Sequence, residues 1–278
     1  MKQITVALDG LNFSACAVKY AALLASSAKT NLTGIFLDDV VNHNYSIYDL
    51  LDDEGVSENK FKALNEKEEE KRKGSVKEFE KICRQANIKC LVRHDRNVAL
   101  QELLKESIYT DLIILDRKET FFQSGKKNPG AFLKGFLADS ECPVFIVPAS
   151  FRAFDKLIFL YDGSPPSVRA VKAFGYLLNT FCHLPLEVVT VKQSADYPDL
   201  SGKYLMREWI KKYFAHAVYT TLSGDSESTI VKYVKTQKND TLFILGARHR
   251  GTLSYWFRES MADVLIQKVQ APLFVVRY

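Results

Sequence analysis

One order of segments occurs twice in this 278-residue chain, and that repeat constrains the fold more than any other feature. The segment ITVALDG (residues 4–10) recurs as LIFLYDG (157–163), and apolar residues at helical spacing follow each copy. Near the end of each half, CPVFIV (142–147) matches APLFVV (271–276). The same order in both halves predicts two copies of one fold, at residues 1–150 and 151–278.

The first copy carries an insertion. The Asp-Gly step recurs 153 residues later, whereas the closing Pro-apolar step recurs 129 residues later, so the first half holds about 24 additional residues. They fall within residues 38–85, where an aromatic, irregular piece (43–55) precedes a charged helix that starts near residue 58. Opposite charges three and four residues apart are typical of a solvated helix face. Recognition of a protein partner through residues 43–85 is the alternative interpretation.

Each half is expected to alternate strands and helices in the order β-α-β-α-β-α-β-α-β. Apolar strands that alternate with helices predict a parallel sheet covered on both faces. The predicted fold class is therefore α/β, with two tandem doubly wound, five-stranded parallel-sheet (Rossmann-like) domains. The expected strand-like segments are residues 4–10, 32–37, 90–94, 111–116, 142–147, 157–163, 186–191, 217–221, 241–246 and 271–276. The main helices are 14–27, the charged helix from about 58, 99–107, 202–215 and 229–236.

Composition excludes several classes of protein. The sequence contains no run of 18 or more apolar residues, so no membrane span is predicted. Its first residues resemble a strand rather than a secretion signal. The five cysteines are scattered without zinc-ligand spacing, which favours a cytoplasmic location and buried thiols. Neither a P-loop nor a G-x-G-x-x-G motif after a strand occurs, so the commonest nucleotide enzymes are excluded.

The net charge of +5 is divided unevenly between the halves. Residues 1–150 hold 21 basic and 22 acidic side chains, whereas residues 151–278 hold 17 basic and 11 acidic ones. The second half, at +6, favours an anionic small molecule as its partner. A dense basic stripe is missing from its sequence, which disfavours nucleic acid.

Asp9 and Asp162 end the first strand of each half. Doubly wound sheets bind ligands beyond the carboxyl ends of their strands, so both residues are site candidates. The alternative is that each Asp caps the following helix or shapes the turn. No Ser-His-Asp or Cys-His set and no metal-ligand spacing can be assembled from the remaining residues, so no catalytic residue is predicted.

Several segments together resemble the universal stress protein family. These are VALDG, FLYDGS, GARHRGTLSYWFRESMADVLIQKVQAPLFVV and GAFLKGFLADSECPVFIVP, and with the repeat they extend the resemblance over nearly the whole chain. The resemblance implies a tandem, cytoplasmic stress-response module with the adenine nucleotide alpha hydrolase-like fold. It also implies that domains pair across their last strands and that one subset binds ATP under the pattern G-x2-G-x9-G-[ST].

That pattern is only partly kept in the second half. Gly246 and Ser260 match its first and last positions, whereas His249 and Glu259 replace glycines. Glycines let the backbone approach the phosphates closely, and the His249 side chain takes up that space. The negative charge of Glu259 repels the phosphates.

In the first half, Asp116 replaces the first glycine, and Gly130 falls on the last one. The resemblance implies that the second half binds the nucleotide or another anionic small molecule. Asp162 and Gly163 would then contact a ribose or base edge, and Val191 would contact the adenine. Gly246 and Ser260 would hold phosphates beside the basic-aromatic loop of Arg248 and His249. Asp9 and Gly130 belong to the weaker first pocket.

The predicted function is a ligand-binding or regulatory module that is not an enzyme, with ATP or another adenine nucleotide as the candidate cofactor. Two alternatives remain open, namely a protein-interaction scaffold without nucleotide binding and weak ATP binding with slow hydrolysis. The last strands, 144–147 and 273–276, are expected to pair within one chain, which makes a pseudo-dimeric monomer or a homodimer.

Overall fold

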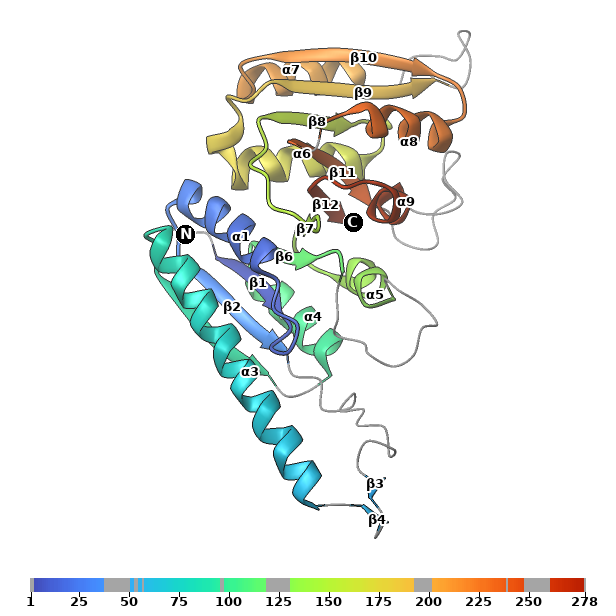
Figure 1. Cartoon of the computed structure of the whole chain (residues 1–278). Coiled ribbons are helices and arrows are strands. Elements are labelled where there is room, and N and C mark those ends of the chain that lie inside the picture. Colours follow the sequence, from blue (N-terminus) through green and yellow to red (C-terminus); the bar gives the residue numbers. More distant parts are fainter. Residues whose placement is uncertain are drawn as a thin grey trace.

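The computed structural model describes residues 3–37, 51–52, 55–56, 58–95, 98–118, 131–192, 202–238, 240–247 and 261–277. Within these ranges the twofold alternation of strands and helices is present, and the predicted α/β fold class is confirmed (Figure 1). The strands are β1 (Ile4–Leu8), β2 (Leu32–Leu37), β3 (Leu51–Asp52), β4 (Gly55–Val56), β5 (Cys90–Asp95), β6 (Leu112–Asp116), β7 (Val144–Val147), β8 (Lys156–Leu160), β9 (Leu186–Lys192), β10 (Ala217–Ser223), β11 (Thr241–Ala247) and β12 (Leu273–Arg277). The helices are α1 (Ala15–Ala28), α3 (Glu58–Gln85), α4 (Ala99–Tyr109), α5 (Ala131–Asp139), α6 (Pro165–Leu177), α7 (Lys203–Tyr213), α8 (Ser226–Thr236) and α9 (Met261–Lys268), with a short 3-10 helix at Asn179–Phe181.

Ten strands form one continuous sheet in the order β10-β9-β8-β11-β12-β7-β6-β1-β2-β5. Neighbouring strands are parallel within each half, and β7 and β12 are antiparallel where the halves meet. Phe145 of β7 lies opposite Phe274 of β12 in that register. The predicted pairing of the two last strands within one chain is thus confirmed.

Two helix layers cover the sheet. Helices α1, α3, α6 and α7 contribute to the hydrophobic core on one face, and α4, α5, α8 and α9 contribute to the core on the other. Each core runs through both halves of the sheet. Helix α8 begins three residues before the expected start, because the Asp225 side chain accepts a hydrogen bond from Ser228 N (3.0 Å) and caps it there.

Helix α3 is the main structural difference between the halves, with 28 residues against 11 in α7. Its C-terminal part packs on β2, where the Phe79 ring fills the space that a side chain at Gly34 would need. None of the described side chains at residues 62–74 is buried, and the N-terminal part projects beyond the sheet (Figure 1). The solvated face predicted for this helix is confirmed. Most of the irregular piece at residues 43–55 lies outside the described residues.

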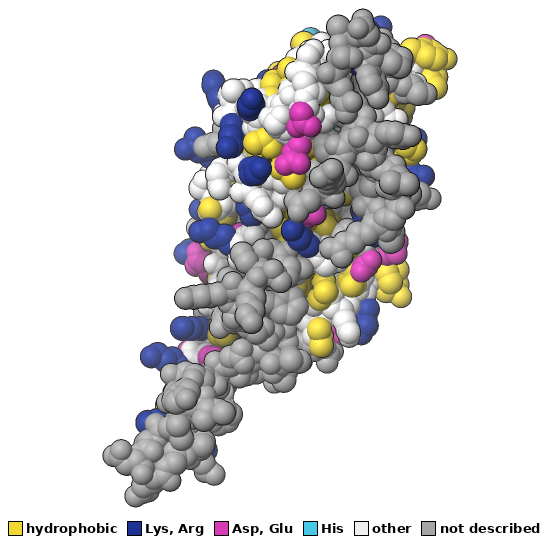
Figure 2. Space-filling model, turned by 90° about the vertical axis from the view of Figure 1, so that its right-hand side faces the viewer, with side chains coloured by type: hydrophobic (Ala, Val, Ile, Leu, Met, Phe, Trp, Pro, Cys, Tyr) yellow, Lys and Arg dark blue, Asp and Glu magenta, His cyan; other side chains and the backbone are white. Residues whose placement is uncertain are grey.

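In the part of the chain that the structure describes, no helix combines the length and apolar character needed to cross a bilayer. On the face drawn in Figure 2, the Lys and Arg side chains of the described residues are scattered over both margins and the area between them rather than gathered in a single dense stripe.

Glu187 of β9 forms a polar contact across three strands of the second half. Lys156 donates to one carboxylate oxygen (2.7 Å), and Thr220 donates to the other (2.6 Å). Burial by itself acts to raise the pKa of Glu187, but hydrogen bonds from Lys156, Thr220 and Tyr233 outweigh burial and hold the pKa below its usual value. The ionised carboxylate therefore stabilises the fold above the unfolded-state pKa of about 4.3, and this stabilisation disappears as the pH falls through the lower folded-state pKa.

Glu187→Gln is accordingly expected to lower the melting temperature near neutral pH and to approach the wild type as the pH falls toward about 3. Differential scanning fluorimetry across that pH range measures the difference. Glu208→Gln, on the exposed side of α7, is the matched control and should change little. A Glu187→Gln deficit that is as large in acid as at neutral pH would contradict this role.

Candidate functional site

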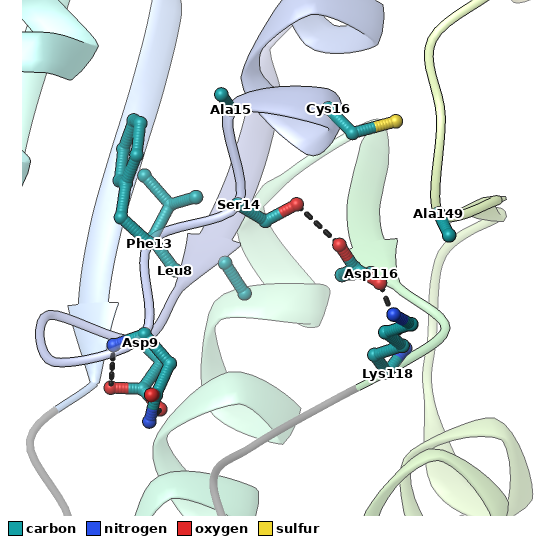
Figure 3. Close-up of a pocket in the computed structure, with 11 residues that line it drawn as sticks. Leu8, Asp9, Phe13, Ser14, Ala15, Cys16, Asp116, Lys118 and Ala149 are labelled. Carbon is teal, nitrogen blue, oxygen red and sulfur yellow. Dashed lines mark hydrogen bonds between the residues drawn. The ribbon is translucent and has the colours of Figure 1, made fainter.

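A pocket of about 470 Å³ opens at the carboxyl ends of β1 and β6. Strands β2 and β5 lie on one side of β1, and β6 and β7 lie on the other, so the chain reverses its direction of travel across the sheet at this point. Ligands of doubly wound sheets bind at such reversals. The pocket is lined by Ala7, Leu8, Asp9, Asn12, Phe13, Ser14, Ala15, Cys16, Asp116, Lys118 and Ala149 (Figure 3).

Ser14 connects the start of α1 to the end of β6. Its hydroxyl oxygen accepts from Ala17 N (3.2 Å), which caps the helix, and its hydroxyl group donates to a carboxylate oxygen of Asp116. The other oxygen of Asp116 accepts from Lys118 N (2.8 Å). Figure 3 shows Ser14 and Asp116 pointing toward each other. The Asp116 carboxylate thus occupies the place at which the first glycine of the ATP pattern was expected.

Asp9 lies on the other side of the same pocket and shapes the loop after β1. One of its oxygens accepts from Leu11 N (2.8 Å) and Asn12 N (3.2 Å), and the other accepts from the Asn12 side chain (2.9 Å). The turn-shaping alternative considered for Asp9 is therefore present in the structure, whereas capping of the helix falls to Ser14.

Asp162 has a comparable local role in the second half. Its Oδ1 accepts from the backbone N–H (2.9 Å) and the hydroxyl of Ser164, which is the residue that caps α6. Gly163 between them has φ +78°, in the left-handed region that favours glycine. Asp162 and Gly163 thus form a tight connection between β8 and α6.

Gly246 lies against the start of α6. A Cβ atom built on it would fall 2.4 Å from the carbonyl carbon of Pro166 and 2.5 Å from the nitrogen of Ser167. The glycine therefore permits a close contact between helix and strand. Pro165 and Pro166 lack N–H groups, and Ser167 N donates to the Ser164 hydroxyl (3.4 Å), so these residues offer no free donor to a phosphate.

Val191 lies one strand away from the Asp162 loop, on β9. The register between β8 and β9 ends at Leu160 and Val189, so Val191 lies beyond the last paired residue of β8. Its side chain is buried, and it pairs with Leu222 of β10 on the other side. The remaining predicted site residues, Arg248, His249, Ser260 and Gly130, lie outside the described residues.

Known proteins resemble this chain in sequence and in fold. A universal stress protein of Synechocystis sp. is 25% identical over 294 aligned residues, with both chains covered in full. The chain is therefore similar to universal stress proteins in sequence and in fold. A universal stress protein from Archaeoglobus fulgidus has the same fold, with a TM-score of 0.68, 19% identity and coverage of 99% of this chain and 98% of that one. A universal stress protein from Pseudomonas aeruginosa aligns with a TM-score of 0.58, 15% identity and coverage of 100% and 93%. No family model matches the chain.

These similarities confirm the resemblance inferred from the repeated motifs. Several residues of the pocket were nevertheless missed from the sequence. Ser14 has a detectable signal, since it directly precedes the first apolar-periodic helix, as N-cap residues do. Arg117 has none. Its side chain donates to the carbonyl of Ala271 (2.9 Å) in the other half, and burial lowers its pKa to about 10.

The pocket at the ends of β1 and β6 presents two carboxylates, those of Asp9 and Asp116, and one thiol, that of Cys16. Burial and then the charge of Asp116 raise the pKa of the Cys16 thiol to about 11, against a smaller opposing effect of Lys19. The thiol is therefore protonated at neutral pH, and it donates to the carbonyl of Pro148 (3.1 Å). No histidine is among the residues that line this pocket. Two carboxylates disfavour a phosphate here and favour groups that donate hydrogen bonds.

Proposed function

We propose that this protein is a cytoplasmic stress-response module that binds a ligand without converting it. The ligand is an adenine nucleotide or another anionic small molecule, held in the second half by Asp162, Gly163, Val191, Gly246, Arg248, His249 and Ser260. In this proposal residues 1–150 and 151–278 are the two domains. The internal pairing of β7 with β12 supports a pseudo-dimeric monomer, because it supplies within one chain a contact between two copies of the fold.

The contrast between Asp116 and Gly246 carries the proposal. Both residues lie toward the carboxyl end of the fourth strand of the pattern, which follows the third helix, namely β6 and β11. In the first half a carboxylate held by Ser14 projects at this position, and a negative charge there opposes phosphate. In the second half Gly246 places no carboxylate at this position, so the charge that opposes phosphate in the first half is missing there, and the proposal assigns the phosphate to the second half.

Charge supports the same assignment. The second half holds 17 basic and 11 acidic residues, whereas the first half is nearly balanced at 21 and 22. A basic surface raises the local concentration of anionic ligands. Ser260 also directly precedes α9, and a hydroxyl at the amino end of a helix is a common phosphate ligand.

Absence of turnover is the further part of the proposal. In the described pocket, the Cys16 thiol is protonated and the Ser14 hydroxyl donates to a carboxylate rather than to a histidine base. This arrangement supports binding over nucleophilic catalysis. Slow hydrolysis of ATP is the alternative, and it would appear as release of phosphate from bound nucleotide.

Asp162→Asn in the full chain is expected to weaken nucleotide binding by about ten-fold or more, since one charge-assisted hydrogen bond to the ligand is lost. The substitution keeps an oxygen that can accept from Ser164 N, so the loop is preserved. Titration with ATP, ADP and AMP by isothermal calorimetry measures the affinity. Asp9→Asn, at the equivalent place in the first half, is the matched control and should bind like the wild type.

Loss of binding in Asp9→Asn with retention in Asp162→Asn would assign the ligand to the first half instead. A wild-type protein that gives no heat with any of the three nucleotides would refute nucleotide binding. That result would favour the scaffold function, in which residues 43–85 and the projecting part of α3 contact another protein.

A further inference from the structure

Two cysteine thiols meet where α3 ends against the edge strand β5. Cys83 lies in the last turns of α3 and is fully buried, whereas Cys90 is the first residue of β5 and is partly exposed. The Cys90 side chain lies close enough to the Cys83 thiol to contribute to the raised pKa of Cys83. Both side chains pack against the same hydrophobic core. They form a pair that neither the family assignment nor the proposed ligand site uses.

The backbone between the two cysteines holds them in place. Asn87 adopts a left-handed conformation with φ +53°, and its N–H bonds to the carbonyl of Arg84 (3.0 Å). Ile88 N bonds back to the carbonyl of Cys83 (3.0 Å), which completes a Schellman turn at the end of the helix. The chain then enters β5, where Cys90 is in register with Leu32 of β2. The contact between the thiols therefore follows from a hydrogen-bonded turn and a paired strand.

The two thiols differ in their access to solvent. Burial, with a further contribution from Cys90, raises the pKa of Cys83 to about 12, so Cys83 stays protonated at neutral pH. Cys90 is the member of the pair that a small oxidant reaches from the surface. Oxidation of cysteine follows exposure and thiolate character, so the first oxidation step falls on Cys90 and Cys83 is placed to resolve it.

We propose that Cys83 and Cys90 are a redox-sensitive pair that closes to an intramolecular disulfide when the protein meets a hydroperoxide. The Cys90 thiolate attacks one peroxide oxygen, the O–O bond breaks, hydroxide or alkoxide leaves, and Cys90 becomes a sulfenic acid. The Cys83 sulfur then attacks the Cys90 sulfur, and the S–OH bond breaks as the disulfide forms. The displaced hydroxide takes the Cys83 proton and leaves as water. The two cysteines together lose two electrons, which the hydroperoxide gains, and a dithiol reductant reverses the reaction.

The position of the pair gives the disulfide a structural consequence. Residues 62–74 of α3 have no buried side chain, so the projecting part of the helix is held to the body through the segment that contains Phe79 and Cys83. A disulfide to Cys90 ties that segment covalently to the edge of the sheet. This inference is independent of the proposed nucleotide site, which lies in the other half.

The test oxidises the full-length protein with hydrogen peroxide under native conditions and then counts free thiols. The count is expected to fall from five to three and to return to five after treatment with dithiothreitol. Trypsin cleaves after Lys81, Arg84, Lys89 and Arg93, so mass spectrometry should find residues 82–84 linked to residues 90–93. Five remaining thiols, or a loss of thiols without this linked peptide, would overturn the proposal.

Variants separate the two steps. In Cys83→Ala the sulfenic acid of Cys90 cannot be resolved, so labelling of Cys90 by dimedone should exceed the wild-type level by roughly ten-fold. In Cys90→Ser, which changes the partly exposed member and spares the core, no linked peptide should form. Cys16→Ser is the control and should still form it, because the Cys16 thiol contacts the Pro148 carbonyl instead. Equal dimedone labelling in the wild type and Cys83→Ala would refute the resolving role of Cys83.

Discussion

Gly246→Ala is expected to lower the free energy of unfolding by about 3 kcal/mol, at the upper end of what overpacking commonly costs. The new methyl group would fall 2.4 to 2.5 Å from three atoms of Pro166 and Ser167, and all three belong to the backbone. No side chain can rotate to relieve such a contact, so α6 has to move away from β11. Urea unfolding followed by circular dichroism measures the loss.

Gly74→Ala is the matched control for that substitution. Gly74 lies in the projecting part of α3, and a Cβ built on it meets no atom within 4 Å. Alanine is a better helix former than glycine, so this variant should be more stable by about 0.5–1 kcal/mol. Opposite signs for the two substitutions would support a steric role for Gly246. A loss below about 1 kcal/mol in Gly246→Ala would show that α6 adjusts without cost, against the close contact described above.

Phe274→Ala is expected to be at least as damaging, with a loss of about 3–5 kcal/mol. Phe274 is fully buried at the junction of the halves, opposite Phe145 in the antiparallel register. Its ring packs edge-on against Phe174 of α6, with centroids 5.4 Å apart and an interplanar angle of 85°. Truncation removes this packing and leaves a cavity beside the two antiparallel strands through which the halves join.

The midpoint of thermal unfolding and limited proteolysis measure the effect of Phe274→Ala. Residues 148–155 connect the halves, so faster cleavage there would show that the junction has loosened. Tyr109→Ala, at a side chain that is 77% exposed, is the control and should change stability by less than about 0.5 kcal/mol. Similar behaviour of the two variants would show that the junction contributes little to stability.

The positions of the elements were predictable because they depend on local patterns. The apolar run expected at residues 186–191 corresponds to β9 at Leu186–Lys192, and the charged helix expected from about residue 58 is α3 at Glu58–Gln85. Apolar periodicity distinguishes buried strands from amphipathic helices without any knowledge of distant contacts. The start of α8 was misplaced because the cap at Asp225 overrides the apolar pattern that follows it.

The geometry of the candidate site was predictable only in part. The sequence indicates that Asp9 and Asp162 end equivalent strands, and it leaves ligand binding and turn shaping open as alternatives. The structure shows that both carboxylates accept hydrogen bonds from their own loops. The bond from Ser14 to Asp116 joins residues that are 102 positions apart. Such a contact requires the two strands to be neighbours, which is a property of the sheet order and of no local pattern.

The sequence by itself determined that this chain contains two copies of an α/β fold, that the first copy carries an insertion, and that its motifs resemble those of universal stress proteins. Spacing and composition suffice for these conclusions because each element buries its own apolar face. Only the tertiary structure decided that the copies share one ten-stranded sheet, that a carboxylate fills in the first half the position that Gly246 holds in the second, and that Cys83 meets Cys90. These features depend on which elements pack against one another, and packing is decided by the fold as a whole.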